Sequence, residues 1–138
     1  MKRRIAFGVL TILWVGMIFW HSAQDAAVSS DMSGGLLEWL GLPISERFLR
    51  KTAHFMLFAV LGVLLSGTLC AGKLPIGWIL LLALAAACAD ETIQSFPQGR
   101  SSEVRDVWLD FSGSVTGLGA FAAVRWLFIR KNFHCKSK

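Results

Sequence analysis

The residues best suited to chemistry are ionisable side chains that lie within or beside strongly apolar segments. His54, Glu91 and Asp106 are candidate catalytic groups, because imidazole and carboxyl groups in a poorly solvated site can transfer protons near neutral pH. No nucleophile elbow, P-loop or paired-histidine zinc motif accompanies them. The sequence therefore predicts an acid/base or hydrogen-bonding group without a cofactor, and it leaves open whether the protein is an enzyme.

A second set of residues is suited to binding a polar or anionic ligand. Arg50 and Lys51 precede His54 by about one helical turn, so the three side chains can share a helix face. Gly99-Arg100 predicts a tight turn that presents a guanidinium group, which suits the capture of a carboxylate or phosphate. The candidate ligand-binding residues are Arg50, Lys51, Asp90, Gln94, Arg100 and Asp110.

Two other interpretations of these charges stay open. His54 with Asp90, Glu91 and Asp106 offers ligand types that suit a divalent cation, but paired-histidine spacing is absent and we assign no metal. The structural alternative is an internal ion-pair network, in which the basic residues neutralise the acids and hold the helices together. Its basic members would be Arg50, Lys51, Arg100 and Arg105.

The composition indicates an integral membrane protein. Of 138 residues, 54% are hydrophobic and only 17% are charged, and the mean hydropathy is +0.56. We expect one domain over 1–138, an all-α bundle of four transmembrane helices. Ser45 is the expected N-cap of a helix that begins at Glu46, and the third span should continue as helix through Gln94 until Pro97 stops it. The predicted spans are roughly 5–20, 53–71, 74–94 and 107–129.

The charge distribution predicts the orientation of these spans. All nine acidic residues fall in or beside 21–52 and 90–110, and we place these segments on the outer side. The N- and C-termini are then both cytoplasmic, and the more basic cytoplasmic side satisfies the positive-inside rule. The polar cluster would lie at the outer face. The basic residues expected inside are Lys2, Arg3, Arg4, Lys73, Arg125, Arg130, Lys131, Lys136 and Lys138.

The partner implied by this pattern is the lipid bilayer, and no nucleic-acid motif is present. The sequence pI of about 9.6 reflects a basic side that faces the membrane surface. A cleaved signal peptide is the alternative for the first span, because Lys2-Arg3-Arg4 precedes an apolar core and Ser22-Ala23-Gln24 offers small residues for processing.

The segment between the first two spans is expected to be mostly irregular. Its serines and Gly34-Gly35 predict a polar loop with turn chemistry. The following residues, 36–40, are expected to lie on the membrane surface with Trp39 at the depth of the head groups.

The last span carries one acid and two glycines on a shared face. Asp110, Gly113 and Gly117 follow Asp106 at helical steps of three and four residues. The pair Gly113-x-x-x-Gly117 lets another helix approach closely. We expect an intramolecular contact there, with self-association through the same glycines as the alternative. Ion pairing, protonation or a polar cavity must offset the cost of placing Asp110 inside the span.

Three blocks in order resemble the VanZ-like family of small bacterial membrane proteins, and the resemblance extends from Ser22 to Gly117. Ser22-x-Gln24 after the first span, and the glycines of the last span, also fit. The three blocks are Arg50-Lys51-x-x-His54-Phe55, then Asp90-Glu91-x-x-Gln94, then Gly99-Arg100 leading to Asp106-Val107.

The sequence departs from that family pattern at three positions. Leu57 stands where an acid is common and Phe58 where tyrosine is usual, so a carboxylate or hydroxyl role is absent there. Asp110 stands where asparagine is usual, which adds a charge. The resemblance implies a multi-pass protein of the bacterial cytoplasmic membrane and, for the member that names the family, low-level resistance to the glycopeptide teicoplanin.

Three functions follow as hypotheses. The first is a protein that binds or modifies an envelope lipid or a lipid-linked, phosphate-bearing cell-wall precursor at the outer interface. The second is a component of proton-coupled transport, since intramembrane carboxylates and histidine can relay protons. The third is a non-catalytic envelope factor whose ion-pair network is structural.

Overall fold

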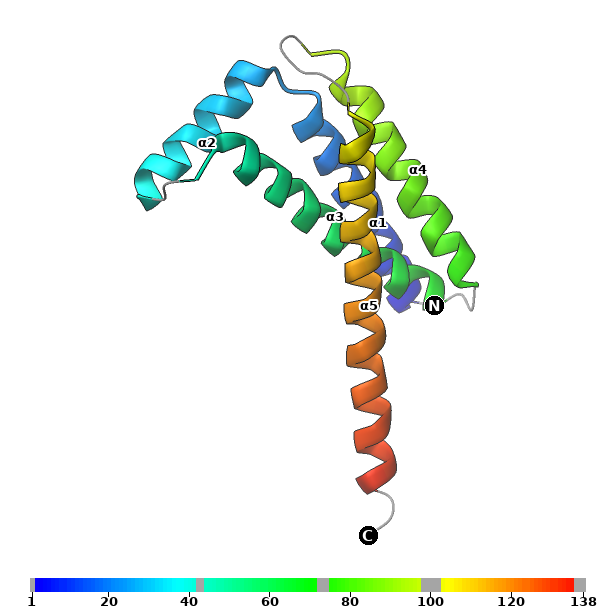
Figure 1. The fold of residues 1–138 in the computed structure, drawn as a ribbon. Helices are drawn as coiled ribbons and strands as arrows, with labels where there is room; N and C mark the ends of the chain where they lie inside the picture. Colours follow the sequence, from blue (N-terminus) through cyan, green and yellow to red (C-terminus); the bar gives the residue numbers. More distant parts are fainter. Residues whose placement is uncertain (1, 42–43, 72–74, 98–102, 136–138) are drawn as a thin grey trace.

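The chain folds into helices joined by short connections. The computed structural model describes residues 2–41, 44–71, 75–97 and 103–135, and the regular structure in these ranges is helical (Figure 1). Four of the described helices, all except α2, are long and apolar enough to cross a membrane. These findings confirm the all-α class and the four spans, whereas the orientation stays a prediction. The helices are α1 (Lys2–Ser22), α2 (Ala26–Leu40), α3 (Glu46–Ala71), α4 (Ile76–Gln94) and α5 (Val104–Cys135).

The helix boundaries follow local sequence signals. Ser45 precedes α3, and its Oγ accepts a hydrogen bond from the backbone N–H of Phe48 at 3.2 Å, as expected of an N-cap. Helix α4 ends at Gln94, shortly before Pro97, also as expected. It begins at Ile76 after Pro75, whose fixed φ suits the entry to a helix. Residue 74, where we placed the start of this span, lies outside the described residues.

The expectation of a polar loop after α1 is wrong. Residues 26–40 form α2, which runs through Gly34-Gly35 and ends at Gly41 in the left-handed conformation, φ 62°. Apolar residues at helical spacing explain the difference, because Leu37 is buried while α2 packs against α3. Tertiary packing of this apolar face outweighs the weak helix propensity of the two glycines.

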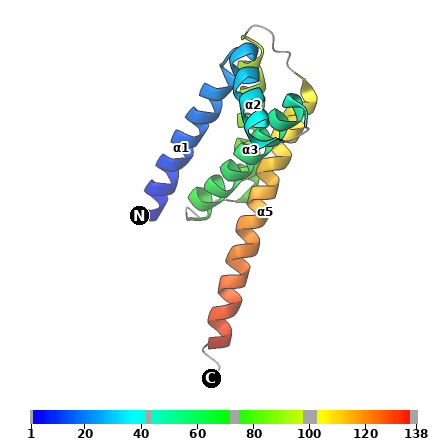
Figure 2. The ribbon, with the colours of Figure 1, turned by 90° about the vertical axis from the view of Figure 1, so that its left-hand side faces the viewer.

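The helices share one polar end. Helices α1 and α4 finish where α3 and α5 begin, and we call this the upper end after its place in Figure 1. Helix α3 contacts each of the other helices and packs most extensively against α5. The second half of α5 extends past the other helices, away from the upper end, as Figures 1 and 2 both show. Side chains near the upper end therefore come from several helices at once.

Three glycines bring α3 and α5 into backbone contact. A Cβ added to Gly113 would lie 2.4 Å from the carbonyl oxygen of Phe55, and one on Gly117 would lie 1.8 Å from that of Ala59. On the opposite helix, a Cβ on Gly62 would lie 2.1 Å from the carbonyl oxygen of Ser114. The glycine seam is therefore an intramolecular contact, as expected. Because α3 fills it, self-association through these glycines finds no support.

Helix α1 is fastened to α3 by polar and apolar contacts. The indole N–H of Trp14 donates to the carbonyl oxygen of Leu57 at 2.9 Å. The hydroxyls of Thr11 and Thr68 lie 3.2 Å apart, within hydrogen-bonding distance. Hydrogen bonds between buried polar groups on different helices are a common way to join spans in lipid. Helix α1 is thereby part of the folded bundle.

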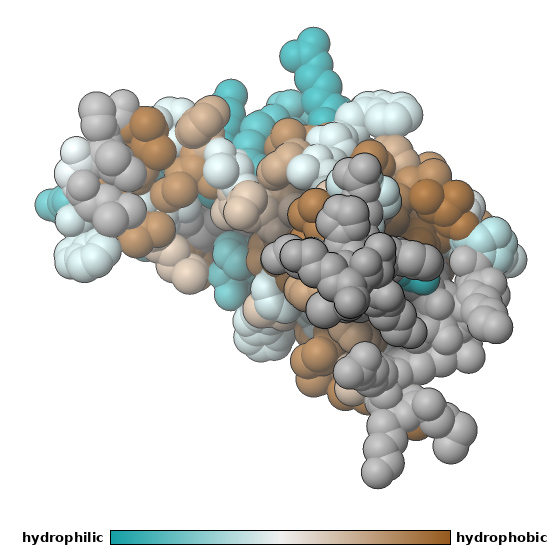
Figure 3. Space-filling model, turned by 90° about the horizontal axis from the view of Figure 1, so that it is seen from below, coloured by the Kyte–Doolittle hydropathy of each residue, from teal (hydrophilic) through white to brown (hydrophobic). Residues whose placement is uncertain are grey.

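The core is small, and most large apolar side chains face outward. The buried cluster includes Phe58, Leu61 and Ile79. By contrast, Ile12 is 73% exposed and Trp20 is 74% exposed. Hydrophobic side chains also occupy much of the face seen from below in Figure 3. An apolar surface of this extent suits a bilayer rather than water.

The glycine seam makes a testable prediction. Gly117→Ala should destabilise the protein by about 1–3 kcal/mol, because the new methyl group overpacks the contact with α3. Gly119→Ala is the matched control, since a Cβ at Gly119 meets nothing within 4 Å on the same helix. Thermal unfolding in detergent measures both variants. Equal melting temperatures for the two would contradict the close contact.

Candidate functional site

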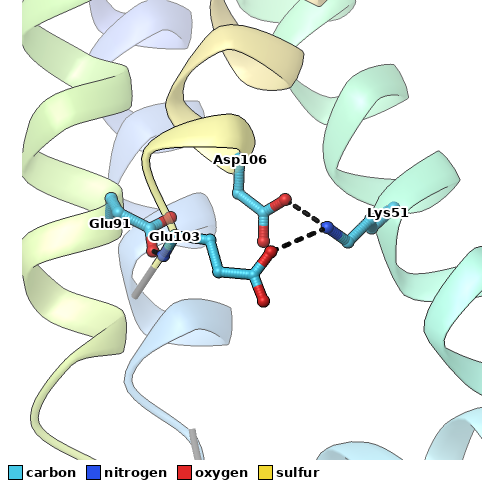
Figure 4. Close-up of polar contacts among 4 residues, drawn as sticks. All are labelled: Lys51, Glu91, Glu103 and Asp106. Atoms are coloured by element: carbon cyan, nitrogen blue, oxygen red, sulfur yellow. Dashed lines mark hydrogen bonds and ion pairs between the residues drawn. The ribbon is translucent and has the colours of Figure 1, made fainter. Parts of the chain in front are cut away.

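An ion-pair group links α3 to the start of α5 at the upper end. The Lys51 Nζ donates a hydrogen bond to Asp106 Oδ1 and lies 3.7 Å from Glu103 Oε2 (Figure 4). The side chains of Lys51 and Asp106 are 37% and 24% exposed, so both stay partly solvated. The predicted binding residue Lys51 and the predicted catalytic residue Asp106 are thus each other's partners.

Glu91 connects α4 to the same end of α5. Its Oε1 accepts a hydrogen bond from the backbone N–H of Glu103 at 2.5 Å. Glu103 directly precedes α5, so the Glu91 carboxylate lies where the helix dipole favours a negative charge. Figure 4 shows Glu91 reaching across to this residue from α4. This geometry gives Glu91 a role in holding the helices together.

A second, deeper group gathers His54, Asp90 and Asp110 from three helices. His54 Nδ1 lies 3.5 Å from Asp90 Oδ2, and each of the three residues offers a ligand atom within 4.8 Å of the others. Asp90 is 0% exposed and Asp110 is 1% exposed. At about 1.5 Å per residue, Asp90 lies roughly 6 Å inside the end of α4 and Asp110 roughly 9 Å inside the start of α5.

Gln94 orients the Asp90 carboxylate. Its amide Nε2 donates to Asp90 Oδ2 at 2.6 Å, one turn further along α4. The other oxygen, Asp90 Oδ1, is buried and has no hydrogen-bond partner among the described residues. The predicted residues Asp90 and Gln94 therefore act as a pair, as their spacing of four residues suggested.

A pocket of about 170 Å³ opens beside His54, between α1, α2 and α3. Its lining residues include an arginine and two histidines. Most of the others are apolar and come from α2 and α3. Its polar lining residues are His21, Ser33, Arg50 and His54, and its larger apolar ones are Met32, Leu36, Leu49 and Leu57.

His21 is a site residue that the sequence analysis missed. Its ring centroid lies 6.3 Å from that of His54, and its Nδ1 is buried without a hydrogen-bond partner in the described part of the chain. The available signal was an ionisable side chain at the end of an apolar span. The α2 lining was missed as well, because that segment was expected to be a loop.

The predicted site residues thus fall into three neighbouring groups. Lys51, Glu91 and Asp106 form the upper network, while Arg50 lines the pocket. His54 belongs both to the pocket and to the buried group with Asp90 and Asp110. The cation-binding set considered from the sequence paired His54 and Asp90 with Glu91 and Asp106, whereas the structure places Asp110 beside them instead. Arg100, with its Gly99 turn, lies outside the described residues.

A family model matches most of the chain. Residues 7–128 match the model of the VanZ/LLP1 family, and this range includes all of the groups above. This chain belongs to the VanZ/LLP1 family. No curated protein and no solved structure matches it. Within this VanZ/LLP1 protein, Leu57 lines the pocket and Asp110 belongs to the buried group, whereas Phe58 is fully buried in the apolar core.

The Lys51–Asp106 pair can be measured by a double-mutant cycle. Lys51→Met and Asp106→Asn should each lower stability, and the double variant should lose less than their sum, with a coupling energy of about 1 kcal/mol. Thermal unfolding in detergent gives the three values. Arg47→Met, on an exposed position one turn earlier in α3, is the control. Strict additivity of Lys51→Met and Asp106→Asn would mean that the two side chains do not interact.

Proposed function

We propose that this VanZ/LLP1 protein binds the anionic head group of an envelope lipid or lipid-linked precursor in the pocket between α1, α2 and α3. The observation that carries the proposal is the composition of the pocket, whose lining combines Arg50 and two histidines with several apolar side chains. A guanidinium group is a bidentate donor to phosphate or carboxylate. The apolar lining suits the first carbons of a lipid chain.

The location of the pocket supports a lipid ligand. It lies near the upper end, beside the start of α3 and the end of α1, where a membrane helix meets the head-group region. Trp39 on the neighbouring α2 is 81% exposed, and tryptophan favours this interfacial depth. A ligand that partitions between hydrocarbon and water would reach the pocket laterally.

We place the upper end on the outer side of the bacterial cytoplasmic membrane, with both termini in the cytoplasm. The support is the asymmetry of basic residues, because Lys2, Arg3 and Arg4 open the chain at the other end of α1. Arg125, exposed near the far end of α5, belongs to that same side. We treat residues 1–138 as a single domain.

Among the predicted acid/base residues, we propose that His54 is the one that contacts the ligand. It lines the pocket, whereas Glu91 and Asp106 bond to the start of α5 and to Lys51. Glu91 and Asp106 would then fix the helices around the site. This proposal keeps part of the hypothesis of a structural ion-pair network, because Glu91 and Asp106 would hold the bundle together.

The distribution of buried polar groups favours a site at one end over a proton path. In the described part of the chain, the buried acids all lie near the upper end. Ser66 and Ser114 are buried deeper, but their hydroxyls donate to the carbonyl oxygens of Gly62 and Phe58 at 2.6 and 3.1 Å. Such hydroxyls satisfy helix backbones and connect no acidic groups. Transport is therefore not the function that we propose.

Arg50→Gln should weaken binding of short-chain phosphatidylglycerol by about tenfold or more, because a charge-assisted hydrogen bond to phosphate contributes about 1.5–3 kcal/mol. The measurement is native mass spectrometry or thermophoresis in a neutral detergent. Arg47→Gln removes an exposed charge one turn earlier on α3 and should bind as the wild type does. Phosphatidylcholine of equal chain length tests charge selectivity. Equal affinity of both arginine variants for phosphatidylglycerol would refute the pocket assignment.

The same variants make a prediction in cells. In a strain that lacks this protein, the wild type and Arg47→Gln should restore teicoplanin susceptibility to its original level. Arg50→Gln should fail to do so at equal membrane abundance, because the pocket loses its anion donor. Minimum inhibitory concentrations and immunoblots of membrane fractions provide the two readouts. Full complementation by Arg50→Gln would show that the pocket has no role in glycopeptide susceptibility.

A further inference from the structure

The buried carboxylates of Asp90 and Asp110 have no lysine or arginine partner among the residues that the structure describes. Both oxygens of Asp110 and Oδ1 of Asp90 are buried without a hydrogen-bond partner in the residues that the structure describes. Lys51, the lysine on the adjoining helix, bonds to Asp106 and Glu103 instead. Two carboxylates inside an apolar bundle are costly without a counter-charge. Two carboxylates therefore need a counter-charge beyond the single one that a protonated His54 could supply.

The three residues have the ligand types and the convergence of a cation site. Asp110 is 1% exposed, and one of its oxygens lies within 4.8 Å of ligand atoms from both His54 and Asp90. Ligands of a tetrahedral zinc ion are about 3.3 Å apart when its bonds are about 2.0–2.1 Å. Small side-chain rotations toward a central ion would close the difference. Three helices thus present one imidazole and two carboxylates to a common point.

We propose that His54, Asp90 and Asp110 bind one divalent cation of the zinc or manganese class. Two carboxylates and a neutral imidazole balance the charge of such an ion, and nitrogen and oxygen donors suit these metals. Gln94, which donates to Asp90 Oδ2 at 2.6 Å, holds that carboxylate as outer-shell residues hold metal ligands. With three protein ligands, the ion keeps at least one coordination position for water or another oxygen donor.

A proton fits this group less well than a metal ion does. One proton shared between Asp90 and Asp110 would satisfy a single pair of oxygens, whereas three carboxylate oxygens lack partners among the described residues. A cation can contact oxygens of both carboxylates and a nitrogen of His54 at once. The geometry therefore favours a metal over protonation.

This site is distinct from the proposed lipid pocket, although the two share His54. Arg50 lines the pocket and is not one of the three ligands, so Arg50→Gln should retain the cation. A protein that binds a cation but no phosphatidylglycerol would contradict only the proposed function. A protein that binds the lipid but no cation would contradict only the present proposal.

The test is metal uptake by the full-length protein in nanodiscs after treatment with a chelator. On addition of Zn²⁺ or Mn²⁺, mass spectrometry of the elements should find about one ion per chain, and the melting temperature should rise. Asp110→Asn keeps the shape of the side chain but removes its charge, and it should reduce affinity for the ion at least tenfold. His54→Gln should have a similar effect.

Asp106→Asn is the matched control, because Asp106 lies one turn earlier on α5 and faces Lys51. This variant should bind the ion as tightly as the wild type, even if its melting temperature is lower. Size-exclusion profiles show which variants remain folded, and uptake is expressed per folded chain. The proposal is overturned if the wild type takes up no stoichiometric ion, or if Asp110→Asn and His54→Gln both retain wild-type affinity.

Discussion

The close approach of α3 and α5 is the contact on which the buried group of His54, Asp90 and Asp110 depends. Gly113 packs on the carbonyl oxygen of Phe55, the residue after His54, and Asp110 precedes Gly113 by one turn on the same face. Without side chains in the seam, the helix backbones touch and His54 is brought to Asp110. The packing of α4 against α5 then adds Asp90. Contact between small residues, rather than burial of large ones, thus builds the site, as expected where lipid removes the hydrophobic drive between helices.

The charged residues form two groups that differ in how their charges are paired and how far they are exposed to solvent. In the upper group, Lys51, Glu103 and Asp106 are joined by ion pairs and stay partly solvated, while Glu91 is buried and accepts a hydrogen bond at the start of α5. The lower group of His54, Asp90 and Asp110 is nearly dry, and several of its oxygens have no partner in the described part of the chain. Apolar residues of similar volume are often at least as stabilising as a buried charged group, which is consistent with the cation that we propose here.

Much of this fold was predictable because strong local signals agree with the tertiary structure. Long apolar runs, the Ser45 cap and the stop before Pro97 located the spans and their ends. The spacing of Gly113 and Gly117 located the seam, although its partner Gly62 stands alone in the sequence and carried no signal. The polar loop expected as far as Gly35 was wrong because the serines and glycines of this segment favour turns, whereas packing of α2 on α3 favours a helix.

The residues of the site could be predicted from the sequence, but the groups that they form could not. The sequence singled out most of these residues, yet periodicity within one helix does not show which residue of another helix will face it. Asp110 joined His54 and Asp90, while Asp106 turned to Lys51, although the two aspartates lie on the same helix face. Asp106 and Asp110 lie at different depths along α5, and this difference decides which residues each one contacts. The crossing of the helices determines which side chains lie at each depth.

The apolar segments of the helices differ in length, so they do not all match the same bilayer thickness. The apolar window of α5, Val104–Phe128, spans about 37 Å as a straight helix, whereas that of α4 spans about 28 Å. A hydrocarbon layer about 30 Å thick matches α4 but is too thin for α5, whose second half extends past the other described helices. Helix α5 must therefore lean or thicken the lipid around it. The seam would transmit that lean to α3, so membrane thickness becomes a variable that acts on the geometry of the buried acids.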